Sequence, residues 1–145
     1  MSFKDLFNEA KVGTEEVKER GKTYEVFKNT NVTKWTYKGK THREQGPAVE
    51  YPNGEQVWFK NGIIHRDKAP AVLHADGSKT WYKNGKIHRD KGPAKEFYNG
   101  GREWWVDGNR HRTDGPAVEL ASGYKAYHLN GNQVSEIDFK KKMKI

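Results

Sequence analysis

The stretch Asn84-Gly85-Lys86-Ile87-His88-Arg89-Asp90-Lys91-Gly92-Pro93-Ala94 decides the fold, because its parts return along the chain every 23 residues. The Pro-Ala tripeptide occurs as Gly46-Pro47-Ala48, Ala69-Pro70-Ala71, Gly92-Pro93-Ala94 and Gly115-Pro116-Ala117. The His-Arg pair occurs as His42-Arg43, His65-Arg66, His88-Arg89 and His111-Arg112. No insertion or deletion breaks this spacing, which indicates four tandem copies of one unit.

An aromatic row and two rows of glycine turns share the same interval. The aromatic row is Trp35, Trp58, Trp81, Trp104 and Tyr127. One turn row is Lys38-Gly39, Asn61-Gly62, Asn84-Gly85, Asp107-Gly108 and Asn130-Gly131. The other is Asn53-Gly54, Asp76-Gly77, Asn99-Gly100 and Ser122-Gly123. Asn-Gly and Asp-Gly between short strands are a strong hairpin signal. We therefore predict an antiparallel hairpin meander in which each unit buries apolar surface against its neighbours.

Size and composition limit the classes of protein that this chain can belong to. Its 145 residues suit a single domain, 1–145, and 33% of them are hydrophobic against 32% charged. Five Trp, seven Tyr and six Phe concentrate the apolar surface in a few large side chains, as a thin sheet requires. The absence of cysteine excludes disulfides and Cys-ligated metals. We expect a cytoplasmic protein, because the sequence has neither a membrane-spanning run nor a secretory stretch.

The ends are predicted to cap the open edges of the sheet. The domain divides into an N-terminal helical cap (1–21), a degenerate half-repeat (22–34), four repeats (35–126), and a half-repeat with a C-terminal cap (127–145). One helical face near the N-terminus is apolar, formed by Phe3, Leu6, Phe7 and Ala10. At the other end, Ser135 precedes two acidic residues and then four lysines, an order that suits a short helix aligned with its own dipole.

Glycine turns, Trp and His that return every 23 residues resemble MORN-type repeats over about residues 22–133. The chain departs from the usual unit in placing Arg after the His. The pattern Asn-Gly-x-x-His-Arg-x-x-Gly-Pro-Ala is similar to variant repeats of small bacteriophage and bacterial proteins, some of them labelled antitoxins. The resemblance implies an all-β, repetitive antiparallel hairpin meander of four units with short N- and C-terminal helical caps. It also implies a binding role, such as a phage-type inhibitor of a host or defence protein or an antitoxin-like module.

A two-residue loop at each glycine turn would give the sheet two unlike faces. One face would pair Val49 with Trp58 and would also carry Tyr51, His74, Phe97 and Leu120, and we interpret this face as the core. The opposite face would pair alanines with the residues after the tryptophans, as Ala48 with Phe59, Ala71 with Tyr82, Ala94 with Trp105 and Ala117 with His128. This second face is either a docking surface or a cover that shields the sheet from water.

The third unit departs most from the others. Lys95 enters the Val row, and the same two-residue loop would set Glu96 opposite Glu103, a destabilising like-charge pair. Departures without structural gain are expected at functional sites. We predict a partner contact centred on the third unit, with the site residues Phe59, Tyr82, Lys95, Arg102, Trp105 and His128.

No pattern in the sequence indicates catalysis. Equivalent histidines of successive hairpins would lie two strands apart, roughly 9–10 Å, which is too far to share a metal ion. We expect these histidines to bond turn backbone, and Arg66 or Arg89 to pair with neighbouring acids. No nucleophile, paired carboxylates or phosphate loop stands out. We predict no enzyme activity, no cofactor and no small-molecule substrate.

The formal net charge of +8 leaves the class of partner open. A partner protein is the favoured reading. The alternative is a nucleic-acid-binding protein that uses aromatics and two basic rows, Arg43/Arg66/Arg89/Arg112 and Lys79/Arg102/Lys125. Three acids that directly follow arginines oppose it: Glu44, Asp67 and Asp90. A third reading is a structural or assembly protein. Salt distinguishes the first two, because phosphate-driven affinity falls steeply with ionic strength.

Overall fold

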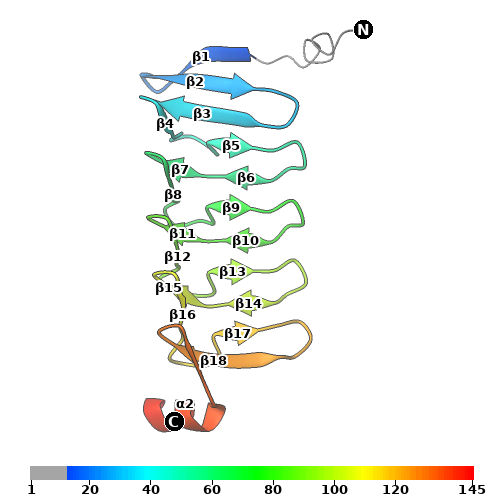
Figure 1. The fold of residues 1–145 in the computed structure, drawn as a ribbon, viewed down its shortest axis with the longest axis vertical. Helices are drawn as coiled ribbons and strands as arrows, with labels where there is room; N and C mark the ends of the chain where they lie inside the picture. Colours follow the sequence, from blue (N-terminus) through cyan, green and yellow to red (C-terminus); the bar gives the residue numbers. More distant parts are fainter. Residues whose placement is uncertain (1–12) are drawn as a thin grey trace.

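The computed structural model describes residues 13–145, which form an elongated stack of antiparallel strands (Figure 1). The long sheet runs in the order β1-β2-β3-β5-β6-β9-β10-β13-β14-β17-β18-β19, and β4 pairs with β3. The described part of the chain is thus mostly β, with a single helix at its C-terminal end. The predicted antiparallel meander is confirmed at this level.

The stack begins with three longer strands and a short one: β1 (Gly13–Glu19), β2 (Lys22–Lys28), β3 (Thr33–Tyr37) and β4 (Lys40–Thr41). The predicted N-terminal helical cap covered residues 1–21, but residues 13–19 are a strand that pairs with β2 along its whole length. The apolar helical face predicted around Phe3 lies outside the described residues.

The rest of the long sheet consists mainly of two-residue strands. They are β5 (Val49–Glu50), β6 (Gln56–Val57), β9 (Val72–Leu73), β10 (Lys79–Thr80), β13 (Lys95–Glu96), β14 (Arg102–Glu103) and β17 (Val118–Glu119). Two longer strands close the sheet, β18 (Lys125–Leu129) and β19 (Asn132–Val134). The turns that join β5 to β6, β9 to β10, β13 to β14 and β17 to β18 lie along one edge of the stack, here called the tips (Figure 1).

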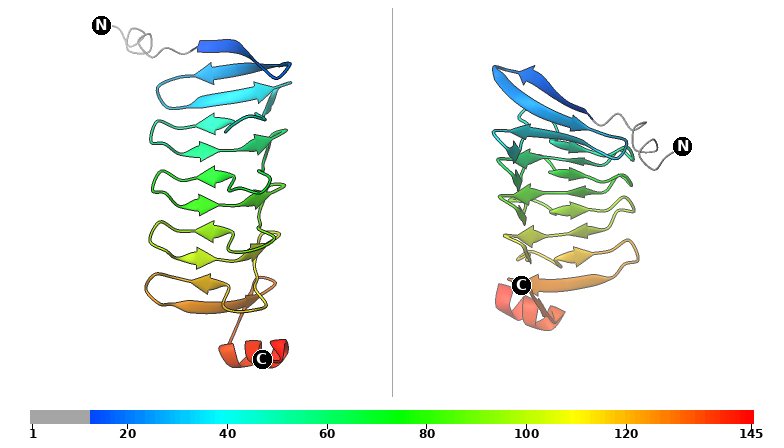
Figure 2. Two further views of the ribbon diagram at one scale, coloured as in Figure 1. Left: turned by 180° about the vertical axis from the view of Figure 1, so that it is seen from behind. Right: turned by 45° about the horizontal axis from the view of Figure 1, so that its top comes forward.

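Small two-stranded hairpins, here called the lateral hairpins, lie along the opposite edge (Figures 1 and 2). They are β7 (Phe59–Lys60) with β8 (Ile63–Ile64), β11 (Tyr82–Lys83) with β12 (Lys86–Ile87), and β15 (Trp105–Val106) with β16 (Asn109–Arg110). Each turn glycine after the first donates its N–H to the preceding hairpin, as Gly85 does to the Ile64 carbonyl at 2.9 Å. The lateral hairpins therefore stack in step with the long sheet.

The tip hairpins have three-residue loops. Tyr51 donates its N–H to the carbonyl of Glu55 at 2.9 Å, which leaves residues 52–54 in the loop. Of these three residues, Gly54 alone has a positive φ, 90°. In the lateral turns both central residues have positive φ, 52° at Asn61 and 82° at Gly62, as a two-residue type I′ turn requires.

The extra loop residue shifts the pairing by one position. Val49 pairs with Val57, whereas a two-residue loop predicted Trp58. Phe59 pairs with Ile64 inside a lateral hairpin, whereas we predicted Ala48. Successive side chains on a strand point to opposite faces. A shift of one residue therefore places the side chains of one strand in each tip hairpin on the face opposite the predicted one. The predicted face of alternating alanines and aromatics does not exist in this arrangement.

The same shift corrects the charges of the third unit. Glu96 pairs with Arg102, and Lys95 pairs with Glu103. The predicted pairing of Glu96 with Glu103 is therefore wrong, and two contacts between opposite charges replace it. Glu96 also accepts a hydrogen bond from Arg89 at 2.8 Å.

One face of the long sheet, the inner face, packs against the lateral hairpins. Cross-strand pairing places an unbroken line of residues on it, here called the inner column: Val49, Val57, Val72, Thr80, Lys95, Glu103, Val118 and Ala126. Phe59, Ile64 and Tyr82 of the lateral hairpins pack against its first three members. Each buried valine contributes about 1.5 kcal/mol relative to an exposed one.

The opposite, outer face carries the Trp row. In four units the guanidinium carbon of the arginine after the His lies 3.6–3.9 Å from the centre of a Trp ring, in the pairs Arg43 with Trp35, Arg66 with Trp58, Arg89 with Trp81 and Arg112 with Trp104. Each arginine also donates to the carbonyl of the proline four residues later, at 2.9–3.5 Å. The His-Arg and Pro-Ala motifs thus build a Trp–Arg–Pro contact in every unit.

The histidines of the motif hold successive units together. Their Nδ1 atoms accept the backbone N–H of the first turn residue of the next unit, at 2.9–3.1 Å, in the pairs His42 with Asn61, His65 with Asn84, His88 with Asp107 and His111 with Asn130. The predicted structural role of these histidines is confirmed.

The C-terminal cap is α2 (Glu136–Met143). Ser135 is its N-cap and accepts the N–H of Asp138 at 3.1 Å, so the predicted helix is confirmed. Phe139 is buried and lies with its ring centre 4.8 Å from that of Tyr127. Tyr127 stands at the end of the Trp row, where Phe139 takes the place that an arginine has in the preceding units.

Candidate docking face

The third unit puts charged side chains where the other units are apolar. Lys95 and Glu103 are cross-strand neighbours in the inner column, and the Glu103 side chain is buried. The carboxylate of Glu103 accepts the indole N–H of Trp105 at 2.7 Å and a hydrogen bond from Arg110 at 3.1 Å. The Lys95 ammonium lies 5.1 Å from the centre of the Trp105 ring. Of the predicted site residues, Lys95 and Trp105 are therefore brought together around Glu103.

The other predicted site residues have different surroundings. Phe59 and Tyr82 are half-buried and pack against the inner column. His128 is buried, and its Nδ1 has no hydrogen-bond partner among the described residues. Arg102 is exposed on the outer face, next to Glu96 and bonded to Glu119 at 3.0 Å. A flat partner cannot touch Arg102 and Trp105 together, because they lie on opposite faces of the sheet.

A hollow of about 300 Å³ lies between the second and third units, beside the tips. Its lining includes Tyr82 and Lys95 from the predicted site, together with His74 and Phe97 from the tips. His74 Nε2 lies 3.0 Å from the Thr80 hydroxyl, which fixes the imidazole against the sheet. Two of the predicted site residues, Tyr82 and Lys95, therefore line a hollow that a partner could reach.

Four exposed apolar or aromatic side chains extend from this hollow along the tips. We call them the tip strip: Tyr51, Tyr98, Leu120 and Tyr124, which are 42%, 72%, 40% and 52% exposed. Tyr51 and Leu120 occupy equivalent positions three units apart, and Tyr124 pairs with Leu120 through the backbone. Because the lateral hairpins stack along the opposite edge of the sheet (Figure 2), they leave the tips uncovered.

Sequence reasoning had assigned two of these residues, Tyr51 and Leu120, to the core, because the assumed two-residue loop placed them on the Trp face. A signal for the three-residue loop was present. Ser122 occupies the Asn position of the last tip turn, and Ser is a poor choice for the positive φ of a type I′ turn. Pro52 precedes Asn53-Gly54, and Pro is favoured at the second position of a type I turn.

The acids that follow the histidines have local partners. His65 Nε2 lies 3.0 Å from Asp67, and His88 Nε2 lies 2.8 Å from Asp90. The hydrogen bond from His65 lowers the pKa of Asp67 below its ordinary value. For Asp90, the bond from His88 lowers the pKa, and a second bond from Lys83 adds to this effect. We predicted that Arg66 or Arg89 would pair with Asp67, Asp90 or a neighbouring unit's acid, and Arg89 donates to Glu96 at 2.8 Å.

Neither a metal cluster nor a membrane-spanning helix is found in residues 13–145. No three His, Asp or Glu side chains there are grouped as ligands for a metal ion. No helix in this range has the length and apolar character needed to cross a bilayer.

Comparison with known proteins gave no relative on which to base a function. No protein-family model, no curated protein and no solved structure matches this chain.

Proposed function

We propose that the chain is a non-enzymatic, MORN-type repeat protein that docks a partner protein through the tip strip and the adjoining hollow. The tip strip supports this proposal best, because tyrosines with this much exposure on a rigid backbone are typical anchors of protein interfaces. The hollow beside it would accept a side chain of the partner between Tyr82, Lys95 and Phe97.

The structural use of the polar motif supports a binding role over catalysis. The imidazole Nδ1 atoms are occupied by backbone N–H groups, and the arginines are occupied by Trp rings and Pro carbonyls. A protein of this kind acts by covering a surface of its partner, as an inhibitor or an antitoxin-like module does.

Site-specific cross-linking tests the position of the interface. A photo-reactive phenylalanine analogue placed at Tyr98 should cross-link to one discrete protein in nuclease-treated lysate of cells that contain the protein naturally. The same analogue at Lys18, which is exposed on β1 at the N-terminal end of the stack, should give no such product. Equal products from the two positions, or capture of nucleic acid alone, would contradict the proposal.

Affinity measurements with the purified cross-linked protein then test the tyrosines themselves. The double substitution Tyr98→Ser/Tyr124→Ser should weaken binding at least about tenfold, because each exposed anchor contributes on the order of 1–2 kcal/mol. The control Lys18→Gln/Lys141→Gln, at two exposed positions on β1 and α2, should bind within about twofold of the parent at 50 and at 200 mM salt. Unchanged affinity in the tyrosine variant would refute the proposed interface.

A further inference from the structure

The positive charge of the molecule is concentrated on one part of the lateral edge. The segments 36–46, 59–69 and 82–92, each a lateral turn with the loop that follows it, together hold ten Lys or Arg and three Asp or Glu. The equivalent segment of the fourth unit, 105–115, holds two basic and two acidic residues. The net charge is thus +7 over three units and zero over the next.

The cations available to a ligand in this region are lysines. The three arginines stack on tryptophans and bond to proline carbonyls. The remaining cations, here called the basic ridge, are Lys38, Lys40, Lys60, Lys68, Lys83, Lys86 and Lys91. Lys83 pairs with Asp90 at 3.3 Å and Lys60 with Asp67 at 4.0 Å. The other five have no carboxylate within 4.0 Å among residues 13–145.

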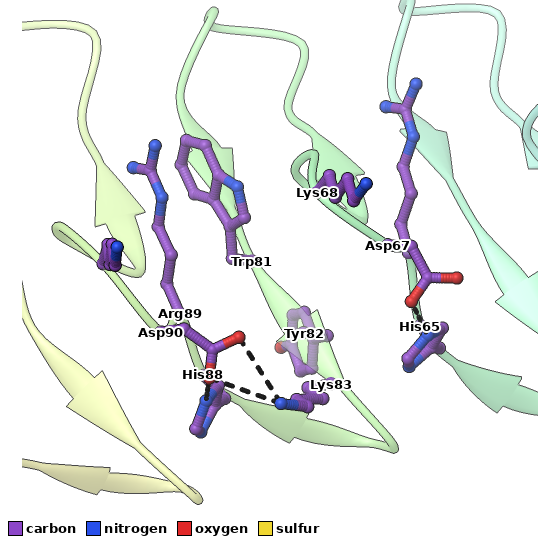
Figure 3. A pocket seen from close by; sticks show the side chains of 11 residues that line it. His65, Asp67, Lys68, Trp81, Tyr82, Lys83, His88, Arg89 and Asp90 are labelled. Carbon is purple, nitrogen blue, oxygen red and sulfur yellow. Dashed lines mark hydrogen bonds and ion pairs between the residues drawn. The ribbon is translucent and has the colours of Figure 1, made fainter.

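A groove of about 870 Å³ joins successive units of the ridge (Figure 3). Lys68 and Lys91 come from its two loops, and Lys83 from the lateral hairpin between them. Lys68 has φ 59° and is the one residue in residues 13–145, other than Gly, that adopts positive φ outside the hairpin turns and the C-cap of α2. Backbone strain of this kind is common at binding sites.

The groove offers charge without a stacking surface. Trp81 lines it, but the guanidinium of Arg89 covers the indole ring at 3.9 Å. Tyr82 also lines the groove, but it is half-buried and packs against the inner column, so the bases of a single strand find no fully open aromatic face here. The chemistry that remains is contact between lysine ammonium groups and phosphate.

We propose that the basic ridge binds the phosphate backbone of a nucleic-acid duplex without sequence preference. Successive units lie two strands apart, so the lysines of three units extend over roughly 20 Å. A small phosphate compound would meet one or two of them, whereas a duplex backbone meets several at once. Lysines act as point charges that contact phosphates and read no base edges. The groove shares Tyr82 with the hollow of the docking face, but none of the ridge lysines lines that hollow.

Two paired variants test the ridge. Lys68→Gln/Lys91→Gln introduces the residue that the first unit has at the equivalent position, Gln45. Lys79→Gln/Lys125→Gln introduces the outer-face equivalent, Gln56, and removes the same charge elsewhere. Binding of a fluorescent 30-base-pair DNA duplex of mixed sequence is followed by anisotropy from 50 to 200 mM salt. The ridge variant should lose about tenfold in affinity at 50 mM, and its salt slope should decrease by about 2.

Each outcome of this experiment decides the proposal. The control variant should stay within about twofold of the parent, and Tyr98→Ser/Tyr124→Ser should bind DNA normally. Equal losses in ridge and control variants would overturn the proposal, because the attraction would then be diffuse. It would also be overturned by absence of binding at 50 mM salt, by tighter binding of a 30-nucleotide single strand, or by binding of phosphatidylserine vesicles in place of DNA.

Discussion

Two corners of the same scaffold, 46 residues apart, are built from opposite chemistry. In the first, the apolar corner, Val49, Val57, Phe59 and Ile64 meet between the long sheet and a lateral hairpin. In the other, the charged corner, the equivalent positions hold Lys95, Glu103, Trp105 and Arg110. The backbone hydrogen bond is the same in both corners. The Ala48 N–H donates to the Val57 carbonyl at 2.9 Å, and the Ala94 N–H donates to the Glu103 carbonyl at 2.8 Å.

The comparison distinguishes the contacts that both corners share from the side chains that differ between them. Both corners keep the same outer-face contact, with Arg66 on Trp58 and Arg112 on Trp104, both at 3.8 Å. Their inner chemistry differs, and the charged corner persists because its one buried carboxylate is surrounded by donors. The Trp–Arg–Pro contacts and the backbone ladder therefore define the unit, and the inner corner is free to change.

The largest effect is expected from removing the centre of the charged corner. Glu103→Ala leaves Lys95 and Arg110 without their counter-charge and the Trp105 N–H without its acceptor, so it should cost about 3 kcal/mol. Val57→Ala, at the equivalent position of the apolar corner, should cost about 2 kcal/mol. Urea unfolding followed by Trp fluorescence measures both. If Glu103→Ala were the milder change, the charged corner would not depend on its carboxylate.

Copying the apolar corner into the third unit should increase stability, whereas Glu103→Ala should decrease it. Replacing Lys95 by Val, Glu103 by Val, Trp105 by Phe and Arg110 by Ile copies the apolar corner into the third unit. We expect stability to increase by about 2 kcal/mol, because burying charges costs more than their mutual attraction returns. The midpoint of urea unfolding and the melting temperature report the change. A less stable graft would mean that packing in the third unit requires the charged side chains.

The sequence alone predicted the repeat and the hairpin meander but not the register. The 23-residue period identified the hairpins because glycines at fixed positions admit few backbone paths. The two turn rows looked alike, and what distinguishes them is whether the residue before Gly has positive φ, as Asn61 has. Because of that single difference, the predicted pairing was wrong by one residue, and the side chains of one strand in each tip hairpin were predicted on the wrong face. It also placed Tyr51 and Leu120 in the core when they are exposed.

The candidate surfaces depended on that register in different degrees. Lys95 and Trp105 were singled out correctly as a departure from the repeat, but their partner, Glu103, was assigned to a repulsive contact. The basic ridge needed no register at all, since it follows from counting charges unit by unit. It was missed because Asp67 and Asp90 were taken as partners of arginines, whereas they bond to histidines.

A smaller and equal effect in both regions is expected on the outer face. Arg66→Lys and Arg112→Lys should each cost about 1 kcal/mol, because lysine lacks the planar group that stacks on Trp and bonds to the Pro carbonyl. Arg102→Lys is the control, since its exposed guanidinium lies 5.6 Å from the Trp104 ring, and it should cost less than about 0.5 kcal/mol. Unequal costs at Arg66 and Arg112 would show that the inner corner influences the outer face.

The smallest effect is expected from pH, and it belongs to the N-terminal end of the stack. His42 is buried, and burial lowers its pKa below the ordinary value of about 6.5. Lys22 and Lys60 act in the same direction, and Glu44 opposes them. The folded state therefore favours the neutral imidazole, whose Nδ1 accepts the Asn61 N–H at 3.0 Å.

The sign of the pH effect follows from this preference. The unfolded chain binds a proton at His42 more readily than the folded chain, so this contribution to stability is complete above pH 6.5 and is lost as the pH falls through the lower folded value. His42→Asn keeps an acceptor near the Nδ1 position and cannot ionise. The free energy of unfolding should therefore fall less between pH 7 and pH 5 in this variant than in the parent. Identical pH profiles would mean that the turn at Asn61 does not require the neutral imidazole.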